Sequence, residues 1–334
     1  MVLRRERIDR GLKVRSEDIF IVRSWREMTY FVAPRLVPIV SLLALLLLSN
    51  TYWQRVLVQA SVFAMLGMSW DLLSSCGLIS LGQALFFGIG AYISGCLNYY
   101  LGWPPLLAIP LATILGALLS TLSLLPVLRL RGIYFSMVTL VIPLTIERII
   151  EATDILGGTE GLTGLTTLPT VWMELLIIFV SLWICLFLLR RLIDSNYGII
   201  IQAINDNDRS VINAGISISW YKAQVIFVGS GIAAFCGAYV THVYQFVGMP
   251  VFAFDYSILP IASVIVGGAG SFGGAILGAF ILVPISELLR GIGGLRIILY
   301  ALFLMVFIVT LPEGIFHFLY RKYSQFERWV EVEK

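Results

Sequence analysis

Long apolar runs separated by short polar or turn-forming stretches dominate this chain. No Asp, Glu, Lys or Arg occurs from Leu72 to Leu128, and from Ala223 to Ser286 the only one is Asp255. An apolar run of roughly 18 residues is long enough to cross the hydrocarbon core of a bilayer, and these runs are several times longer. None alternates with period two, as the strands of a membrane barrel do. The pattern predicts an all-α, polytopic transmembrane protein.

Turn residues divide the apolar runs into about ten membrane segments. Pro104 and Pro105 separate the third from the fourth, because proline lacks the amide donor that a helix interior needs. The Gly-rich regions 78–100 and 257–289 are equally typical of broken or re-entrant helices and of straight spans. The segments are expected at 36–54, 56–74, 78–100, 105–128, 133–152, 172–189, 223–246, 257–270, 272–289 and 296–311.

The positions of the basic residues predict the orientation of these segments. Lys and Arg in short loops are retained on the cytoplasmic side. With the N-terminus in the cytoplasm, ten spans return the C-terminus to that side and leave 19 of the 23 Lys and Arg residues there. We therefore expect a basic cytoplasmic tail at 1–35, a transmembrane domain at 36–311 with a cytoplasmic loop at 190–222, and a cytoplasmic tail at 312–334.

Composition supports this class and excludes others. Hydrophobic residues make up 59% of the 334 positions and charged residues 13%, whereas soluble domains carry about 25% charged residues. This composition excludes a soluble enzyme. Because the net charge of +3 follows from the orientation of the loops, it indicates no nucleic acid ligand.

No motif in the chain predicts a cofactor or a metal. The four cysteines have no paired spacing and no histidines at ligand spacing, so they are interpreted as buried free thiols. The sequence at 268–273 matches GxGxxG, but it lies within an apolar run and not between a strand and a helix, where that motif binds a dinucleotide. No catalytic constellation of a known kind occurs either.

The loop at 190–222 contains two short amphipathic helical patterns. Ser195 or Asn196 is suited to cap the first, and Gly215 is suited to end the second. One interpretation is a segment that lies on the membrane surface. The other is a docking element whose apolar face enters a groove of a cytoplasmic partner, with the Asn and Asp side chains of 205–208 at the rim. The expected apolar face consists of Ile199, Ala203, Ile204, Val211 and Ala214.

Five blocks of sequence resemble permease subunits of ABC importers, in the family that takes up branched-chain amino acids (the LivM-like branch). Four of the blocks lie at 80–92, 128–140, 157–164 and 266–274, in the order found in the family. The fifth lies in the cytoplasmic loop and follows the family pattern G-(x)4-AI-x-D-x-(D/E)-(x)6-G-I. Its matching residues are Gly198, Ala203, Ile204, Asp206, Asp208, Gly215 and Ile216.

The resemblance implies a transport protein of a prokaryotic inner or plasma membrane that has no enzymatic activity of its own. Its expected partners are cytoplasmic ATP-binding subunits, a second permease subunit, homologous or identical, an extracytoplasmic substrate-binding protein and the lipid bilayer. The expected substrates are branched-chain or other apolar amino acids. The residues expected to couple ATP hydrolysis to transport are Gly198, Ala203, Ile204, Asp206, Asp208, Ala214 and Gly215.

Two alternatives remain open from the sequence. One is a permease of the same family that carries urea or short amides. The other is an ion-coupled secondary transporter, although that class places carboxylates near the middle of the membrane and the charge-free runs offer few of them.

Candidate transport-path residues come from the apolar blocks and the few charges near them. Gln83, Phe87 and Gly88 belong to the first block. Gly270 and Gly274, followed by Gly278 at the same spacing, are expected on one helix face, where glycine permits close packing or lines the path.

The other candidates carry charge or lie alone in apolar runs. Glu147, Arg148 and Glu151 are either wetted in the outer headgroup layer or form an outer vestibule, with Arg148 facing the carboxylate of a zwitterion and the acids facing its ammonium group. Asp71 is either a residue of the transport path or a cap at the inner end of the second segment, and the cap is the favoured interpretation. His242 is expected to be hydrogen-bonded in the interior.

Overall fold

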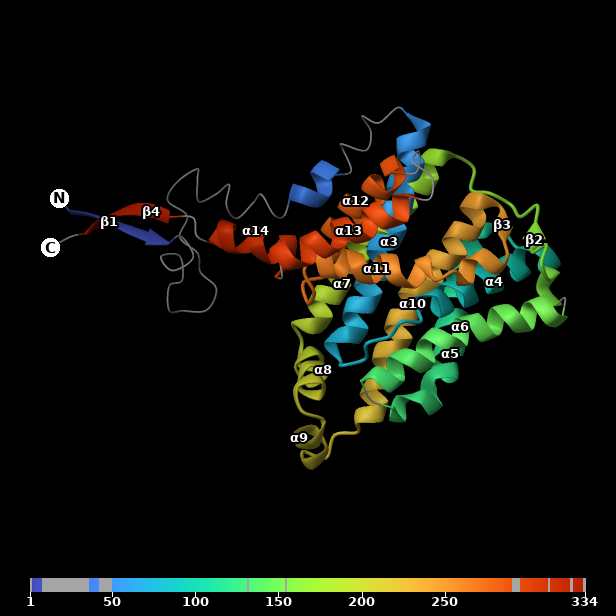
Figure 1. Ribbon diagram of the computed structural model, residues 1–334, viewed down its shortest axis with the longest axis horizontal. Coiled ribbons are helices and arrows are strands. Elements are labelled where there is room, and N and C mark those ends of the chain that lie inside the picture. Colours follow the sequence, from blue (N-terminus) through green and yellow to red (C-terminus); the bar gives the residue numbers. More distant parts are fainter. Residues whose placement is uncertain are drawn as a thin grey trace.

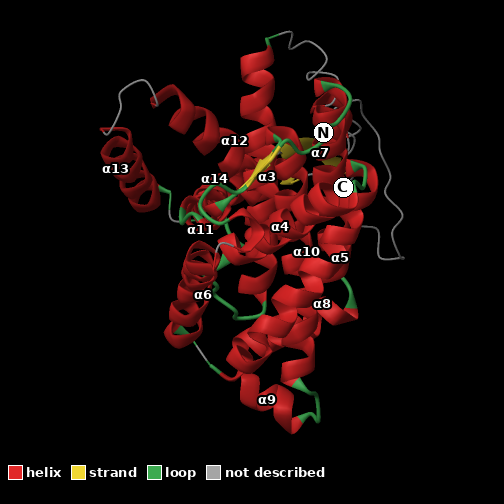
Figure 2. Ribbon diagram, turned by 90° about the vertical axis from the view of Figure 1, so that its right-hand side faces the viewer, coloured by secondary structure: helices red, strands yellow, loops and turns green. Residues whose placement is uncertain are grey.

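The computed structural model describes residues 2–7, 36–41, 50–130, 132–153, 155–289, 295–311, 313–324 and 327–332. Nearly all of the described residues are helical, as the apolar runs predict (Figures 1 and 2). The α-helices are α3 (Thr51–Ser75), α4 (Gln83–Leu101), α5 (Pro105–Leu124), α6 (Ile133–Thr153), α7 (Val171–Ile193), α8 (Asn196–Asp206), α9 (Asp208–Asn213), α10 (Ile218–Tyr244), α11 (Asp255–Gly267), α12 (Gly273–Leu288), α13 (Leu295–Thr310) and α14 (Gly314–Ser324).

Short 3-10 helices and four strands complete the described elements. The 3-10 helices are η1 (Leu125–Arg129), η2 (Ile155–Gly157) and η3 (Met249–Phe252). Strand β2 (Leu162–Thr163) pairs antiparallel with β3 (Phe246–Val247). Strand β1 (Val2–Arg7) pairs antiparallel with β4 (Glu327–Val332), which brings the two ends of the chain together (Figure 1).

Seven helical segments of the described chain are long and apolar enough to cross a membrane, fewer than the ten expected. The middle of the expected segment 36–54, residues 42–49, lies outside the described residues. Helices α12 and α13 have 16 residues each, short of the ~20 that span a bilayer. The expected segment 78–100 starts with a non-helical stretch at 78–82, and α4 begins only at Gln83. The seven segments are Thr51–Ser75, Gln83–Leu101, Pro105–Arg129, Ile133–Thr153, Val171–Ile193, Ile218–Tyr244 and Met249–Gly267. The last of these joins η3 to α11, which alone has 13 residues.

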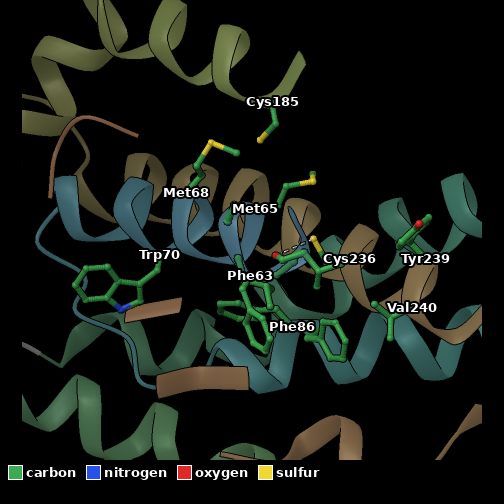
Figure 3. Packing of buried hydrophobic residues seen from close by; sticks show 14 of the residues in the cluster. Phe63, Met65, Met68, Trp70, Phe86, Cys185, Cys236, Tyr239 and Val240 are labelled. Atoms are coloured by element: carbon green, nitrogen blue, oxygen red, sulfur yellow. Dashed lines mark hydrogen bonds between the residues drawn. The ribbon is translucent and has the colours of Figure 1, made fainter. Parts of the chain in front are cut away.

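Helix α3 forms the centre of the bundle, with every residue from Ala60 to Leu73 buried. Aromatic and sulfur-containing side chains of α3, α4 and α10 fill the space around it (Figure 3). The thiol of Cys236 on α10 lies 3.9 Å from the carbonyl oxygen of Val62 on α3. Within lipid, such packing holds helices together, because lipid tails are as apolar as the side chains that they touch.

Glycines let the helices approach closely where α4, α10, α11 and α12 meet. A Cβ atom at Gly90 of α4 would collide with the backbone of Ala234 on α10, and a Cβ atom at Gly237 of α10 would collide with the carbonyl of Phe87. At Gly278 of α12, a Cβ atom would collide with the carbonyl of Ser263 on α11. These contacts explain why so many glycines lie within apolar helices, where glycine is otherwise unfavourable.

The helices run alternately between two ends of the bundle. One end carries α8 and α9, at the bottom of Figures 1 and 2, and the other carries the loop 155–170 and the β2–β3 pair. Helix α3 ends beside α8. Near the start of α3, Arg55 forms an ion pair with Glu174 at the start of α7. The bundle is thus bounded by two different faces, one helical and one built mainly of loops.

Candidate functional site

The segment between α7 and α10 folds as two short helices at one end of the bundle. Gly198, Ile201 and Ile204 of α8 and Val211 of α9 are buried against the body of the protein. Gly198 is required there, because a Cβ atom would collide with the carbonyl of Ile193. The expected apolar face was partly wrong: Ile199 is 64% exposed, since the buried positions follow a three-residue spacing that starts at Gly198.

The ends of these helices are fixed by hydrogen bonds. Ser195 occupies the N-cap position of α8 as expected, but its hydroxyl donates to the carbonyl of Leu192 and does not cap the helix. Asn207, which was expected at the rim of a docking element and not at a cap, caps α9 by accepting from the amides of Arg209 and Ser210. Gly215 has a φ of 78° and ends α9, as predicted.

The end of α9 is a Schellman motif. The amide of Gly215 donates to the carbonyl of Ile212, and the amide of Ile216 donates to that of Val211. The paired caps at Asn207 and Gly215 fix where α9 begins and ends. The segment therefore presents its outer side chains from a rigid frame.

The outer side of the segment combines apolar and charged groups. Ile199 and Ile212 are 64% and 53% exposed, and Asp206 and Arg209 are exposed beside them. Ala203 is half-buried, and Ala214 is exposed. An exposed apolar pair with charges at its edge has the composition of a docking surface.

A polar pocket of about 360 Å³ lies between this segment and the end of α3. Its lining includes Asp206 and Asp208 of the segment, Cys76 and Gly77 after α3, and the largely buried Lys222 of α10. Burial raises the pKa of the Cys76 thiol to about 11, although the nearby Lys222 ammonium acts in the opposite direction. Asp206 and Asp208 thus lie where the segment meets the membrane domain.

A partly buried, hydrogen-bonded loop connects α11 and α12. The carboxylate of Asp71, which is 2% exposed, accepts from the amides of Gly270 at 2.7 Å and Phe272 at 3.1 Å. Asp71 therefore does not cap its own helix as expected, and Cys76 occupies that position. The loop has the left-handed backbone φ of 81° at Gly270 and 49° at Phe272.

This loop changes the interpretation of the glycine series. Gly270 is exposed and lies before α12, so it shares no helix face with Gly274 and Gly278, contrary to the expectation. Gly274 and Gly278 do belong to α12 and are buried. A Cβ atom at Gly274 would collide with the carbonyl of Gly268, so close packing explains both glycines.

The candidates of the first block lie deep inside the bundle. Gln83 is fully buried at the start of α4, and its Nε2 has no hydrogen-bond partner among the described residues. Phe87 stacks on Tyr256 of α11 with 4.2 Å between ring centroids. Gly88 leaves room for the ring of Phe252, with which a Cβ atom would collide.

The non-helical stretch before Gln83 is held from two sides. The indole nitrogen of Trp70 donates to the carbonyl of Ser80 at 2.7 Å. From α6, the hydroxyl of Ser136 donates to the carbonyl of Ile79, and Thr139 accepts from the amide of Leu81 at 3.1 Å. Helix α4 thus begins inside the protein at a fixed position.

The charged candidates near the other end form an exposed ion pair. Arg148 and Glu151 are 2.5 Å apart on one face of α6, with 75% and 39% of their side chains exposed, and Glu147 precedes them half-buried. A second ion pair, not predicted from the sequence, joins Arg55 to Glu174 at 2.6 Å; the Glu174 side chain is only 3% exposed. No local pattern links these two residues, which lie 119 positions apart.

His242 is hydrogen-bonded in the interior, as predicted. Its Nδ1 lies 2.8 Å from the carbonyl of Thr166, and its Nε2 lies 2.9 Å from the hydroxyl of Ser94. A carbonyl only accepts, so the geometry assigns the proton to Nδ1 and leaves Nε2 to accept from Ser94. The neutral ring thereby fastens the loop 155–170 to α4 and α10.

An apolar bundle with seven described helical segments able to cross a membrane defines a multi-pass membrane protein. The family described as the permease component of branched-chain amino acid transport systems matches residues 52–311. Because this match covers most of the chain, the protein belongs to that family. Its members are transport components and not enzymes, and ATP hydrolysis lies on a separate subunit.

Individual relatives agree with the family match. Two LivM permease proteins of high-affinity branched-chain amino acid transport systems, from Salmonella typhimurium and Escherichia coli, are each 25% identical over 76% of this chain and 67% of their own length. A probable LivM permease of Methanocaldococcus jannaschii is 25% identical over 64% of this chain and 68% of its own. No solved structure matches the chain.

Proposed function

We propose that this protein forms one half of a membrane pore that carries branched-chain amino acids into the cytoplasm of a prokaryotic cell. The relatives named above supply the substrate class. The bundle supports the choice of an apolar cargo, because the rings of Phe63 and Phe87 each stack on Tyr256 in its interior and form an apolar wall. Binding sites for small ligands commonly combine such walls with a few polar groups.

The proposed topology has ten membrane segments and both tails in the cytoplasm. Its support is the alternating direction of the helices, with α8 and α9 at the inner end and the β2–β3 pair at the outer end. The pairing of β1 with β4 also favours two tails on the same side. Helices α11 and α12 fit a hairpin of two short segments, since 13 residues rise only about 20 Å along a helix.

The segment α8–α9 is proposed to couple ATP hydrolysis on partner subunits to movement of the bundle. The observation that carries this proposal is its two-sided burial, with Ile201, Ile204 and Val211 fixed inside and Ile199 and Ile212 exposed. A force applied to the outer side would act directly on α7 and α10, which lead into and out of the segment. Such a rigid element can bias a two-state opening of packed helices.

The path itself is proposed to pass near Gln83, Phe87 and Gly88. The support is the unpartnered amide nitrogen of Gln83 at the buried start of α4, because a helix N-terminus with a free donor is suited to a substrate carboxylate. At the outer end, the exposed pair of Arg148 and Glu151 is suited to a first contact with a zwitterion. An extracytoplasmic binding protein and a second permease subunit complete the proposed assembly.

Charge reversal on the segment tests the coupling role. In liposomes that contain the whole complex, Asp206→Lys should abolish substrate-stimulated ATP hydrolysis and leucine uptake together. The matched control, Glu160→Lys, makes the same change at an exposed position of the outer loop and should leave both rates unchanged. Full stimulation in the Asp206 variant would refute the role of the segment.

The substrate is tested separately in the same liposomes. Radiolabelled leucine uptake should be inhibited by isoleucine and valine and be insensitive to urea or acetamide. Inhibition by urea at similar concentrations would assign the chain to the amide carriers of the family. Uptake driven by a proton or sodium gradient without ATP would contradict both assignments.

A further inference from the structure

An apolar groove of about 780 Å³ opens between α7 on one side and α5 and α10 on the other. Leu188 of α7, Leu118 of α5 and Phe227 of α10 form its walls, and all three are at least 40% exposed. The groove lies at the end of the bundle that carries α8, whose Tyr197 also contributes to the lining. Its location is separate from the polar pocket beneath the coupling segment.

The length of the groove matches one leaflet of a bilayer and not a whole membrane. Along α10 the lining runs from Trp220 to Val228, nine residues that span about 12 Å. One leaflet contributes about 15 Å of the ~30 Å hydrocarbon core. A helix of a neighbouring subunit that crossed the membrane would need a contact surface about twice as long.

The inner end of the groove carries the groups that bind a phospholipid headgroup. Arg191 lies in the last turn of α7, exposed, and no acidic partner is recorded for it among the described residues. Asp194, the nearest carboxylate in sequence, lies beyond the end of α7. Across the groove, Trp220 is 63% exposed in the first turn of α10. Arginine binds phosphate through two parallel hydrogen bonds, and tryptophan is enriched at the level of the headgroups.

We propose that this groove binds an anionic glycerophospholipid of the cytoplasmic leaflet. Its phosphate lies on Arg191, its glycerol region lies beside Trp220, and one acyl chain extends along Leu118, Leu188 and Phe227. The charge favours an anionic lipid over a zwitterionic one, because Arg191 is the only charged residue among the described residues that line the groove. The lipid bridges α7 and α10, the two helices that hold the coupling segment.

Native mass spectrometry of the detergent-purified complex tests this site directly. Dioleoyl phosphatidylglycerol and dioleoyl phosphatidylcholine carry the same chains and differ in headgroup charge. The wild-type complex should retain the former at least about tenfold more tightly. Arg191→Glu should remove that preference, whereas Arg190→Glu, the same change at an exposed neighbour outside the lining, should keep it.

A second variant tests the groove apart from its charge. Ala223→Trp places a ring inside the lining and should displace the bound lipid while Arg191 remains. The thermal midpoint of each variant in detergent separates lost binding from lost folding, and Arg191→Gln provides a milder replacement.

Several results would overturn the proposal. If the Arg190 and Arg191 variants lost the preference for phosphatidylglycerol equally, the preference would come from general surface charge and not from this groove. If the wild-type complex retained both lipids equally, the proposed headgroup contact would be wrong. Unchanged binding in the Ala223 variant would place the lipid elsewhere. Efficient cross-linking of Trp220→Cys to a second permease subunit in membranes would mean that protein, not lipid, covers the groove. All of these results are independent of which substrate is carried.

Discussion

Replacing Asp71 should loosen the connection between α11 and α12 more than any other single carboxylate change at this end of the bundle. Its two oxygens accept from the amides of Gly270 and Phe272 at 2.7 and 3.1 Å, and Asp71 itself is 2% exposed. Phe272 has a φ of 49° and a ψ of −40°, a sparsely populated conformation that costs a non-glycine residue roughly 1–3 kcal/mol. The carboxylate thus stabilises a backbone turn that is strained on its own.

The magnitude follows from the two hydrogen bonds. A bond to a charged acceptor contributes roughly 1.5–3 kcal/mol, and an amide left buried without a partner is costly in its own right. Asp71→Asn keeps one acceptor oxygen and should cost about 2–3 kcal/mol. Asp71→Ala removes both and should cost about 3–6 kcal/mol. A loss of 3 kcal/mol corresponds to an increase on the order of 100-fold in local opening.

Amide hydrogen exchange is the assay that isolates this loop. Peptides covering Gly270 and Phe272 should exchange on the order of 100-fold faster in Asp71→Asn, and peptides of α14 should follow, because Gly314 packs directly on Gly268. The control is Asp194→Asn, the same change at an exposed position after α7. Equal exchange of the loop in the two variants would refute the assignment of Asp71 as its anchor.

Three further predictions test other parts of the site. Gln83→Met removes a buried amide nitrogen without a partner, so the thermal midpoint in detergent should stay unchanged or rise. Leucine uptake should nevertheless fall. Unchanged uptake would exclude Gln83 from the transport path. Arg55→Ala leaves the 3%-exposed Glu174 carboxylate without its ion-pair partner and should lower the thermal midpoint by several degrees. Arg148→Ala removes an exposed ion pair worth about 0–1 kcal/mol, so it should lower uptake and leave the thermal midpoint unchanged. Burial raises the pKa of Cys76 to about 11, so only about 0.1% of this thiol is thiolate at pH 8. In a variant without the other cysteines, Cys76 should be alkylated roughly 100-fold more slowly than a free thiol. The alkylation rate should rise about tenfold per pH unit up to pH 10.

Local pattern predicted several features of the fold correctly. The apolar runs predicted helices, and the run 105–128 agrees closely with Pro105–Leu124 followed by η1. Gly215 predicted the end of α9 because a left-handed residue there is a local requirement. His242, alone in an apolar run, predicted an internal hydrogen bond because an imidazole within the bundle needs partners.

Features that join distant segments could not be predicted in the same way. Asp71 bonds amides 199 and 201 residues away, so its own helix suggested only a cap. Gly270, Gly274 and Gly278 are equally spaced, but the turn at Phe272 starts α12 after Gly270 and removes that residue from the common face. The face of α8 was misassigned at Ile199, because only contact with the body of the protein distinguishes one apolar stripe from its neighbour.

These long-range contacts also determine how the two ends of the protein are connected. Helix α3 contacts α7 beside Glu174 at the end of the bundle opposite α8, and it ends at Cys76 beside the polar pocket under α8. Between these ends it carries Asp71 and the close contact with α11 and α12. If α8–α9 moves as proposed, α3 is a single buried helix that connects that movement with the Arg55–Glu174 ion pair at the opposite end. We therefore expect a tilt of α3 to accompany the proposed coupling.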